Sequence, residues 1–448
     1  MAQAPIEETR LSFFRQSAWT FLTRVLVTLI NIPISILVAR RLGPEGQGAY
    51  SAALAFAGLW ATSALLSVDA AHTYYLAGRK APLRAVLGNS IAWSLGIGLL
   101  ATPLYLLLSP AVQKEPSALF AQVLTLSAAA VPLQLLKAFV VATLLGQERI
   151  ERYNLLQVVS NLVLLALLLL VLFTPLKSAL WAVAAYLGSA AVFVVAGGVL
   201  LRRSLGEERL ELSPALARES VVYGLKGHVG VFFAQFTYRF DQVLVTRMVG
   251  LEAQGFYSIA VLLAEKLTMI SQSIHLVLFP RVSASAPAEA NRLTAAACRF
   301  TFLFVIVAGI GLWVLGGFLV RLFYSSAFEP ALPAFRILLP GVAILSLSRL
   351  LSGDLSGRGV RIPQTFALGS AFVINLGLDL LLIPRLGIVG AAWASTAAYV
   401  WQTLFLMAVF WKVSGVSPDR LLVPRGEDLS LVRSALSRMR PRRGGTQP

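Results

Sequence analysis

Charged residues are scarce in this chain: they make up 13% of its 448 residues, whereas hydrophobic residues make up 57%. The mean hydropathy of +0.76 excludes a soluble domain, because no water-facing surface of this size tolerates that composition. Alternating segments of about ten residues, which mark a membrane β-barrel, are also missing. Apolar runs of about 20 residues follow one another instead, and they predict an all-α polytopic membrane protein.

Cysteine and histidine are nearly absent, with one cysteine and three histidines in the whole chain. Cys298 alone cannot form an internal disulfide, and so few ligands leave no cluster that suits a metal ion. We therefore expect no metal site and no cofactor.

Motifs of membrane enzymes are missing as well. The chain has no GxxxxGK[ST] sequence, which excludes nucleotide hydrolysis by a P-loop. It also lacks HExxH, GxSxG and a large acid-bearing outer loop, which argues against a protease, a lipase and a lipid-dependent glycosyltransferase or polymerase. The loops between the apolar runs are too short to hold a soluble domain. We therefore expect no catalytic residues and no enzymatic activity.

The net charge of +17 suggests nucleic acid at first sight, but basic residues of a polytopic protein normally occupy its cytoplasmic loops. With the N-terminus in the cytoplasm, 24 of the 38 basic residues fall in inner segments and 7 in outer segments. This excess predicts that both termini are cytoplasmic and that the number of spans is even. We expect no nucleic acid partner.

Twelve transmembrane helices are predicted, six in each half of the chain. Their ranges are 17–39, 50–76, 85–108, 119–145, 153–173, 179–201, 220–248, 256–282, 293–323, 331–355, 363–383 and 388–411. The predicted segments are a cytoplasmic N-terminal segment at 1–16, an N-lobe at 17–201, a cytoplasmic linker at 202–219, a C-lobe at 220–411 and a basic cytoplasmic tail at 412–448. Two alternatives stand for the tail: a helix lying on anionic headgroups, or a disordered topogenic segment.

A 14-residue sequence occurs twice, at a constant offset of 207 residues. The copies, Arg40–Ala53 and Arg247–Ala260, are identical at 8 of these 14 positions. Internal repeats of several helices are typical of secondary transporters. The repeat predicts that the chain consists of two related six-helix bundles.

Polar residues form one stripe along the first helix of each half. In the first half, Arg24 shares a helical face with Thr28, Asn31 and Ser35. In the second half, the stripe holds His228, Gln235, Arg239 and Gln242. At the repeat offset Thr28 falls on Gln235 and Ser35 on Gln242. Because a polar stripe facing lipid is costly, we expect both stripes to line one shared hydrated cavity.

Further charges lie inside the predicted spans. Lys137 and Arg349 fall on equivalent positions at an offset of 212 residues, which places a cation at one depth in both halves. The acids Asp69, Asp241, Glu265 and Asp379 are candidates for binding a coupling cation. Two structural alternatives stand beside these roles: a basic side chain near a helix end can reach the interface, and Arg239 can form an ion pair with Asp241.

Three stretches resemble a known family: ArgArgLeuGlyProGluGlyGlnGlyAlaTyr at 40–50, PheAspGlnValLeuVal at 240–245, and 375–392, which begins AsnLeuGlyLeuAsp. They are similar to the O-antigen and polysaccharide flippases (Wzx type) of the multidrug/oligosaccharidyl-lipid/polysaccharide (MOP) transporter superfamily. The resemblance covers about 12–412. It implies two six-helix lobes in a V-shaped fold around a central cavity that opens alternately to each side of the bacterial cytoplasmic membrane.

The resemblance implies that the cargo is an undecaprenyl-pyrophosphate-linked oligosaccharide, carried from the inner to the outer leaflet for O-antigen, capsule or exopolysaccharide synthesis. The implied partners are membrane lipids and the glycosyltransferases and polymerase of the same pathway. The residues fit this cargo independently, because arginine binds phosphate oxygens in a bidentate manner. We expect the headgroup phosphates to bind Arg24 and Arg239, together with Lys137 and Arg349.

Two other functions remain as alternatives. One is a MATE-like, cation-coupled exporter of drugs or small solutes, in which Asp69, Asp241 or Glu265 binds a proton or sodium ion. The other is a membrane scaffold without transport, which the two polar stripes disfavour. For the flippase itself, a proton gradient, a sodium gradient and the membrane potential are alternative energy sources.

Overall fold

The computed structural model describes residues 6–423, except for 270, 273, 276–277, 279–281 and 283–284, and it describes side chains from Trp19 onward. Most of the predicted basic tail, at 424–448, lies outside the described residues. The described residues are almost entirely helical, and none of them forms a strand. Nine helical segments among them are long and apolar enough to cross a membrane, so the protein is a multi-pass, all-α membrane protein.

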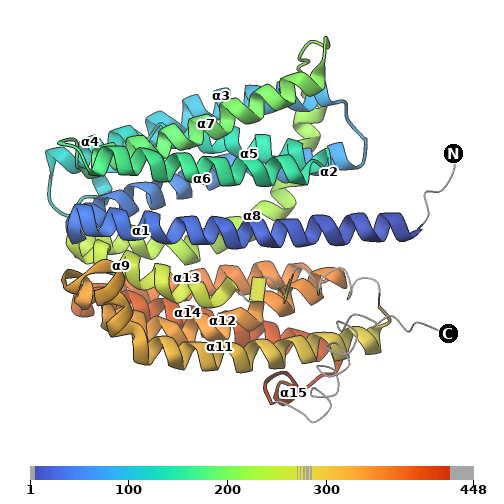
Figure 1. Cartoon of the computed structure of the whole chain (residues 1–448). Helices are drawn as coiled ribbons and strands as arrows, with labels where there is room; N and C mark the ends of the chain where they lie inside the picture. Colours follow the sequence, from blue (N-terminus) through green and yellow to red (C-terminus); the bar gives the residue numbers. More distant parts are fainter. Residues whose placement is uncertain are drawn as a thin grey trace, which may run out of the picture. The chain divides into compact units, whose positions relative to one another are not determined.

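The helices follow one another along nearly the whole chain (Figure 1). In order, they are α1 (Ile6–Leu65), α2 (Val68–Ala77), α3 (Leu83–Leu108), η1 (Ser109–Val112), α4 (Ala118–Ser127), α5 (Ala130–Gly146), α6 (Ile150–Leu172), α7 (Ala179–Leu205), α8 (Pro214–Met248), α9 (Leu251–Ala264), η2 (Glu265–Leu267), α11 (Pro287–Tyr324), η3 (Ser326–Ala331), α12 (Leu332–Gly357), α13 (Ile362–Leu386), α14 (Ile388–Ser414) and α15 (Asp419–Leu422).

The predicted helices agree with these elements in kind but not at every boundary. The first apolar segment, Trp19–Leu65, covers most of the predicted span 17–39 and the first part of the predicted span 50–76, and α1 is interrupted between them at Gly43. The predicted span 50–76 is two helices in the structure, since Leu66 and Ser67 have positive φ angles of 48° and 54°. The predicted span 119–145 is likewise divided between α4 and α5.

The connection between the two halves is shorter than the predicted linker 202–219. Helix α7 continues to Leu205, and α8 already begins at Pro214. The Ser213 hydroxyl accepts a hydrogen bond from the backbone N–H of Leu216, and Pro214 occupies the first helical position. This serine–proline pair is a strong helix start, because both residues satisfy or remove donors that the first turn leaves unpaired.

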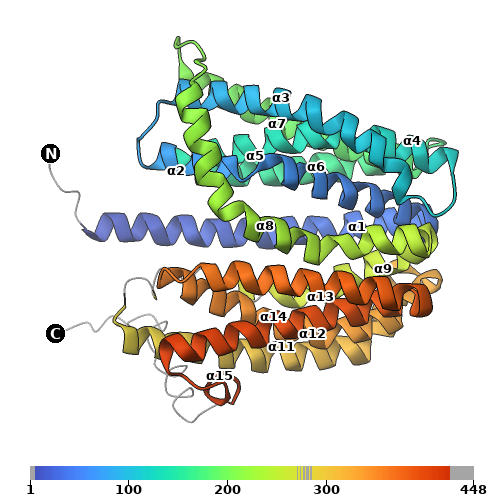
Figure 2. The same cartoon turned by 180° about the vertical axis from the view of Figure 1, so that it is seen from behind.

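Contacts divide the chain into two compact units. Unit 1 comprises Met1–Leu263, Leu315–Leu338 and Leu368–Ala398, and unit 2 comprises Ala264–Val314, Leu339–Ala367 and Tyr399–Pro448. Unit 1 thus contains all helices of the first half, together with α8, nearly all of α9 and parts of α11 to α14. Within unit 1, α8 runs beside α2 and then along α1 (Figure 2).

The two copies of the repeated motif pack against each other inside unit 1. We call this contact the motif crossing; it consists of Arg40–Ala53 in α1 and of Arg247–Ala260, which includes the end of α8 and most of α9. Each copy changes direction at its first glycine, Gly43 with φ of 70° and Gly250 with φ of 125°. Glycine occupies these positions because other residues rarely adopt such angles.

The second of the two glycines that the copies share, Gly48 in one and Gly255 in the other, brings the two backbones together. A Cβ atom at Gly48 would lie 1.7 Å from the carbonyl oxygen of Leu251. At the equivalent position of the other copy, a Cβ atom at Gly255 would lie 1.9 Å from the carbonyl oxygen of Pro44. Since Leu251 and Pro44 are also equivalent in the repeat, each copy makes the same close approach to the other.

Side chains repeat this reciprocal arrangement. Gln47 Nε2 donates to Ser258 Oγ at 3.1 Å, and Gln254 Nε2 donates to Ser51 Oγ at 3.3 Å. The two glutamines are equivalent in the repeat, and so are the two serines. Each hydrogen bond therefore links one copy to the other, and both glutamines are buried.

The shared arginine of each copy ties it to the other half of the chain. Arg40 donates to the carbonyl oxygens of Leu322 and, at 2.7 Å, Phe323, in the last turn of α11. Arg247 donates to the carbonyl oxygens of Gln113 at 2.6 Å and Lys114 at 3.4 Å, just after η1. Because the last carbonyls of a helix have no partner within the helix, arginine satisfies them well.

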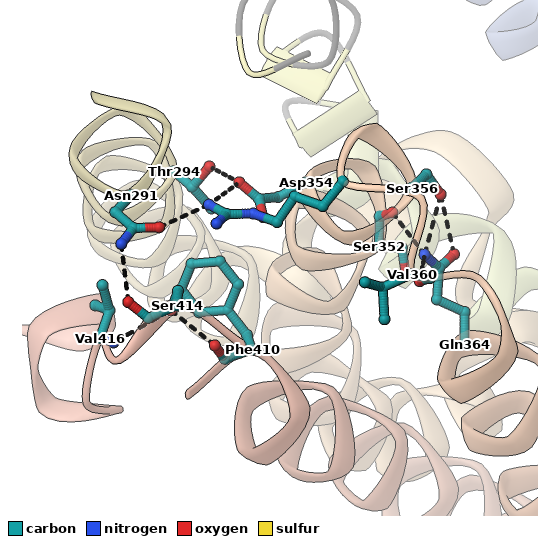
Figure 3. Close-up of polar contacts among 11 residues, drawn as sticks. Asn291, Thr294, Ser352, Asp354, Ser356, Val360, Gln364, Phe410, Ser414 and Val416 are labelled. Carbon is teal, nitrogen blue, oxygen red and sulfur yellow. Dashed lines mark hydrogen bonds and ion pairs between the residues drawn. The ribbon is translucent and has the colours of Figure 1, made fainter. Parts of the chain in front are cut away.

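A buried ion pair organises unit 2 (Figure 3). Asp354 in α12 is fully buried and accepts hydrogen bonds from Arg358 and from Thr294 Oγ1, the latter at 2.6 Å. Arg358 also donates to Asn291 at 2.7 Å, and Asn291 donates to the Ser414 carbonyl at 2.8 Å. The network thereby joins α11, α12 and α14, and it satisfies a carboxylate that would otherwise be costly to bury.

We expect Gly48→Ala and Gly255→Ala each to destabilise the protein by about 1–3 kcal/mol or more, because the new methyl group overlaps a backbone carbonyl that cannot move alone. Gly96→Ala is the matched control, since nothing lies within 4 Å of its Cβ position. The measurement is the fraction of monodisperse protein left after heating in detergent. Equal melting of all three variants would contradict the close approach.

In unit 2, Arg358→Met leaves the Asp354 carboxylate buried without its cation, which should cost about 3–5 kcal/mol. The double variant Asp354→Leu/Arg358→Met removes both charges and should recover most of that loss. Thermal unfolding of the two variants in detergent measures the difference. A double variant as unstable as the single one would show that the network contributes nothing through its charge pairing.

Candidate functional site

Asp241 of α8 is the centre of a buried polar site in unit 1. Its Oδ2 accepts a hydrogen bond from the Tyr257 hydroxyl at 2.5 Å and one from the Ser395 hydroxyl at 3.1 Å. Its Oδ1 accepts from the backbone N–H of Gln242 at 2.7 Å. The Asp241 side chain is 1% exposed, and Tyr257 and Ser395 are fully buried. Three elements, α8, α9 and α14, thus converge on one carboxyl group.

A second buried carboxyl group lies within electrostatic range of it. Asp379 of α13 is 1% exposed, and it is close enough that the charge on Asp241 acts on it. Neither carboxyl oxygen of Asp379 has a hydrogen-bond partner within the described part of the chain. Asn375 lies one turn earlier on α13, is also 1% exposed, and has an equally unpartnered amide nitrogen. We refer to Asp241 and Asp379 as the acid pair.

The acid pair cannot hold two uncompensated negative charges. Burying an isolated carboxylate costs many kcal/mol, and a like charge nearby increases that cost. Arg239 of α8 already supplies one positive charge that acts on Asp241, and burial favours a further positive charge, such as a proton on Asp379, over a second carboxylate. Within the described residues, no group of three or more His, Cys, Asp or Glu could hold a metal ion.

The predicted phosphate-binding cations occupy different surroundings. Arg24 is exposed on α1, whereas Arg239 is half-buried on α8 and its charge acts on Asp241. Lys137 of α5 is half-buried, with Nζ 4.9 Å from the centre of the Phe193 ring. Arg349 of α12 belongs to unit 2, and its Nε is buried without a hydrogen-bond partner among the described residues.

The predicted polar stripes are partly engaged in structural contacts. Ser35 lies 3.1 Å from the Tyr324 hydroxyl, and buried His228 lies 3.2 Å from Ser67 Oγ. Gln242 is buried and accepts a hydrogen bond from Gln254 at 3.2 Å. The other three predicted lining residues are half-buried; they are Thr28, Asn31 and Gln235.

The other two predicted coupling acids belong to other elements. Asp69 is half-buried in the first turn of α2, where its charge suits the helix N-terminus. Glu265 is half-buried in η2 and belongs to unit 2. Of the four predicted acids, the structure therefore brings together Asp241 and Asp379.

Sequence reasoning did not identify Tyr257, Ser395 and Asn375 as site residues. Two of them carried a signal: Tyr257 is one of the residues shared by the two motif copies, and Asn375 precedes Asp379 by four residues on an apolar helix. No sequence signal pointed to Ser395, because serine is common among the small residues of a helix such as α14. Its contact with Asp241 spans 154 positions and is visible only in three dimensions.

The amino-acid sequence is similar to a known protein family and to a known membrane protein. Residues 13–285 match the family described as polysaccharide biosynthesis protein. An uncharacterized membrane protein of Methanocaldococcus jannaschii is 25% identical over 234 residues, which are 50% of this chain and 45% of that protein. The chain thus spans somewhat less than half the length of this curated relative.

Solved structures with the same fold are transporters. The lipid II flippase MurJ, in an inward closed conformation, is similar with a TM-score of 0.75 and 15% identity over 95% of this chain and 91% of that chain. An inward-facing multidrug resistance MATE family transporter of the MOP superfamily has a TM-score of 0.71 and 17% identity, covering 87% and 96%. A MOP superfamily transporter from Pyrococcus furiosus has a TM-score of 0.62 and 13% identity, covering 90% and 96%.

The family match covers more than half of the chain, and the resemblance expected from the motifs is confirmed. The chain belongs to the polysaccharide biosynthesis protein family, and it has the fold of the MOP transporters.

Proposed function

We propose that this protein is a flippase that moves a polyprenyl-pyrophosphate-linked oligosaccharide across the membrane, and that a cation bound at the acid pair drives the movement. The observation that carries the coupling is the buried carboxyl group of Asp379, which has no hydrogen-bond partner in the described part of the chain and lies within electrostatic range of Asp241. A charge-binding group of this kind inside a membrane helix marks an ion pathway or a proton relay far more often than a packing contact.

The cargo follows from the family and from the basic residues inside the spans. A polyprenyl tail can stay in lipid while the pyrophosphate and sugars cross through a polar path. The pyrophosphate is anionic and loses water on the way, so cations such as Arg24 and Arg239, with Lys137 and Arg349, would offset its desolvation. The charge asymmetry of the loops supports cytoplasmic termini. The family resemblance supports transport from the inner to the outer leaflet of a bacterial cytoplasmic membrane.

Binding and release of one positive charge at the acid pair can then drive a change in the arrangement of the helices. Cation binding removes one of the two negative charges of the acid pair, and the charge of Arg239 acts on the other. It thereby stabilises one arrangement of α8, α9, α13 and α14, which hold the two carboxyl groups and the residues around them. Release of the cation on the opposite side leaves the carboxyls uncompensated and favours another arrangement. The flippase would work beside glycosyltransferases and a polymerase, which make and consume lipid-linked oligosaccharides.

A cation-coupled exporter of drugs or small solutes is the second candidate. The acid pair and the likeness to a MATE family transporter favour it, since such exporters need the same kind of coupling site. The exposed cation Arg24 argues for anionic cargo instead, because a cationic drug would meet a like charge. Accumulation of lipid-linked sugar in a deletion strain, against retention of a fluorescent dye, distinguishes the two.

Replacement of the membrane arginines tests the cargo. We expect Arg24→Ala and Arg239→Ala each to lower surface polysaccharide at least about tenfold, because each loses a charge-assisted contact worth about 1.5–3 kcal/mol. The measurement is complementation of a deletion strain, with protein levels in the membrane checked by immunoblot. Arg321→Ala is the control, since this arginine is exposed and pairs with Glu329 at 2.7 Å. Full complementation by both variants would refute phosphate binding.

Replacement of the acids tests the coupling. We expect Asp379→Asn to abolish transport while leaving the melting temperature unchanged or higher, because the amide keeps the shape and removes a buried, unpartnered charge. Asp241→Asn should also abolish transport. Asp69→Asn should retain it, which separates this acid from the pair. Normal transport by Asp379→Asn would show that the acid pair does not couple.

A further inference from the structure

The motif crossing is symmetric in its contacts but not in its surroundings. Gln47 and Gln254 make equivalent hydrogen bonds to Ser258 and Ser51, and in both glutamines the Oε1 atom is buried without a partner among the described residues. Gln254 Nε2 makes one additional hydrogen bond, to Gln242 Oε1 at 3.2 Å. This extra bond distinguishes Gln254 from Gln47.

This additional bond connects Gln254 to the side chain of Gln242, the residue next to Asp241. The backbone N–H of Gln242 donates to Asp241, and the Tyr257 hydroxyl, one turn beyond Gln254, donates to the same carboxyl group. In the first copy, the position equivalent to Asp241 is Ile34, and the position equivalent to Gln242 is Ser35. Isoleucine has no carboxyl group, so the first half of the chain has no charge at this position. The motif crossing is therefore connected to a carboxyl group through the second copy.

Opening of the crossing would act on this connection. A transporter that exposes one site alternately to two sides must break contacts at one end of its helices and later remake them. By the charge asymmetry of the loops, the crossing lies toward the outer face. If the two copies separate, Gln254 loses Ser51 and is free to leave Gln242, which alters the support of Asp241.

We propose that Gln254 is a positioning residue for Asp241, and that it links cation occupancy of the acid pair to opening of the motif crossing. This inference rests on the proposed coupling at the acid pair and goes beyond it, because it names the contact that carries the coupling. Linkage is reciprocal: if opening changes the affinity of the acid pair for a cation, the cation must change the open fraction by the same factor.

The test measures the crossing itself and needs no cargo. Spin labels on Glu45→Cys and Glu252→Cys report the distance between equivalent, exposed positions of the two copies by pulsed electron resonance. The native Cys298 is fully buried and does not compete for the label. The purified full chain, in lipid nanodiscs, is compared with and without Na⁺ at one pH, and at high and low pH without Na⁺.

In the otherwise native protein, we expect one of the two cations to change the open-to-closed ratio at least about fivefold. Gln254→Leu should reduce this response below about twofold, because the link to Gln242 is lost. Gln47→Leu, the matched control, removes the equivalent glutamine–serine bond and should retain the response. Both variants lose one bond between the copies, so a general loosening of the crossing would affect them equally.

Three outcomes would overturn the inference: no response of the native protein to either cation, equal responses in the two glutamine variants, or a full response in Gln254→Leu. Asp379→Asn separates this failure from that of the proposed function. If Asp379→Asn abolishes the response and Gln254→Leu keeps it, the acid pair couples by another route. If Asp379→Asn responds as the native protein does, the proposed coupling site itself is wrong.

Discussion

A carboxyl group inside an apolar helix bundle must be neutral or compensated, and this constraint governs the interior of the protein. Two solutions occur in the chain. In unit 2, Asp354 is compensated permanently by Arg358 and by hydroxyl and amide groups around it. In unit 1, Asp379 has no such partner among the residues that the structure describes. The first arrangement suits structure, and the second leaves a place for a charge that comes and goes.

The two halves of the chain share the motif crossing, but the acid pair belongs to the second half alone. Both copies of the motif keep the glycine, glutamine and serine that make the crossing, because each contact has its equivalent in the other copy. The acid pair has no counterpart in the first half, where Ile34 replaces Asp241. Duplication thus accounts for the packing, and a few later differences account for the charge that the packing surrounds.

Much of the fold follows from the sequence, since apolar runs and basic loops reflect the solvent around each segment. The break between α1 and α2 did not follow, because Leu66 and Ser67 carry no turn signal; there Gly224 of α8 approaches the Leu66 carbonyl, and this packing is tertiary. Asp241 and Asp379 could be predicted as isolated acids in helices. Their proximity could not, because it depends on how α8, α13 and α14 meet.

Infrared difference spectroscopy of the purified protein tests the central claim most directly, because it detects a carboxyl group changing its charge. On addition of Na⁺, or on a change of pH without Na⁺, the account predicts that the C=O band of a protonated carboxyl group appears or disappears, and that Asp379→Asn removes this change. Identical spectra for the native protein and Asp379→Asn under both conditions would contradict it.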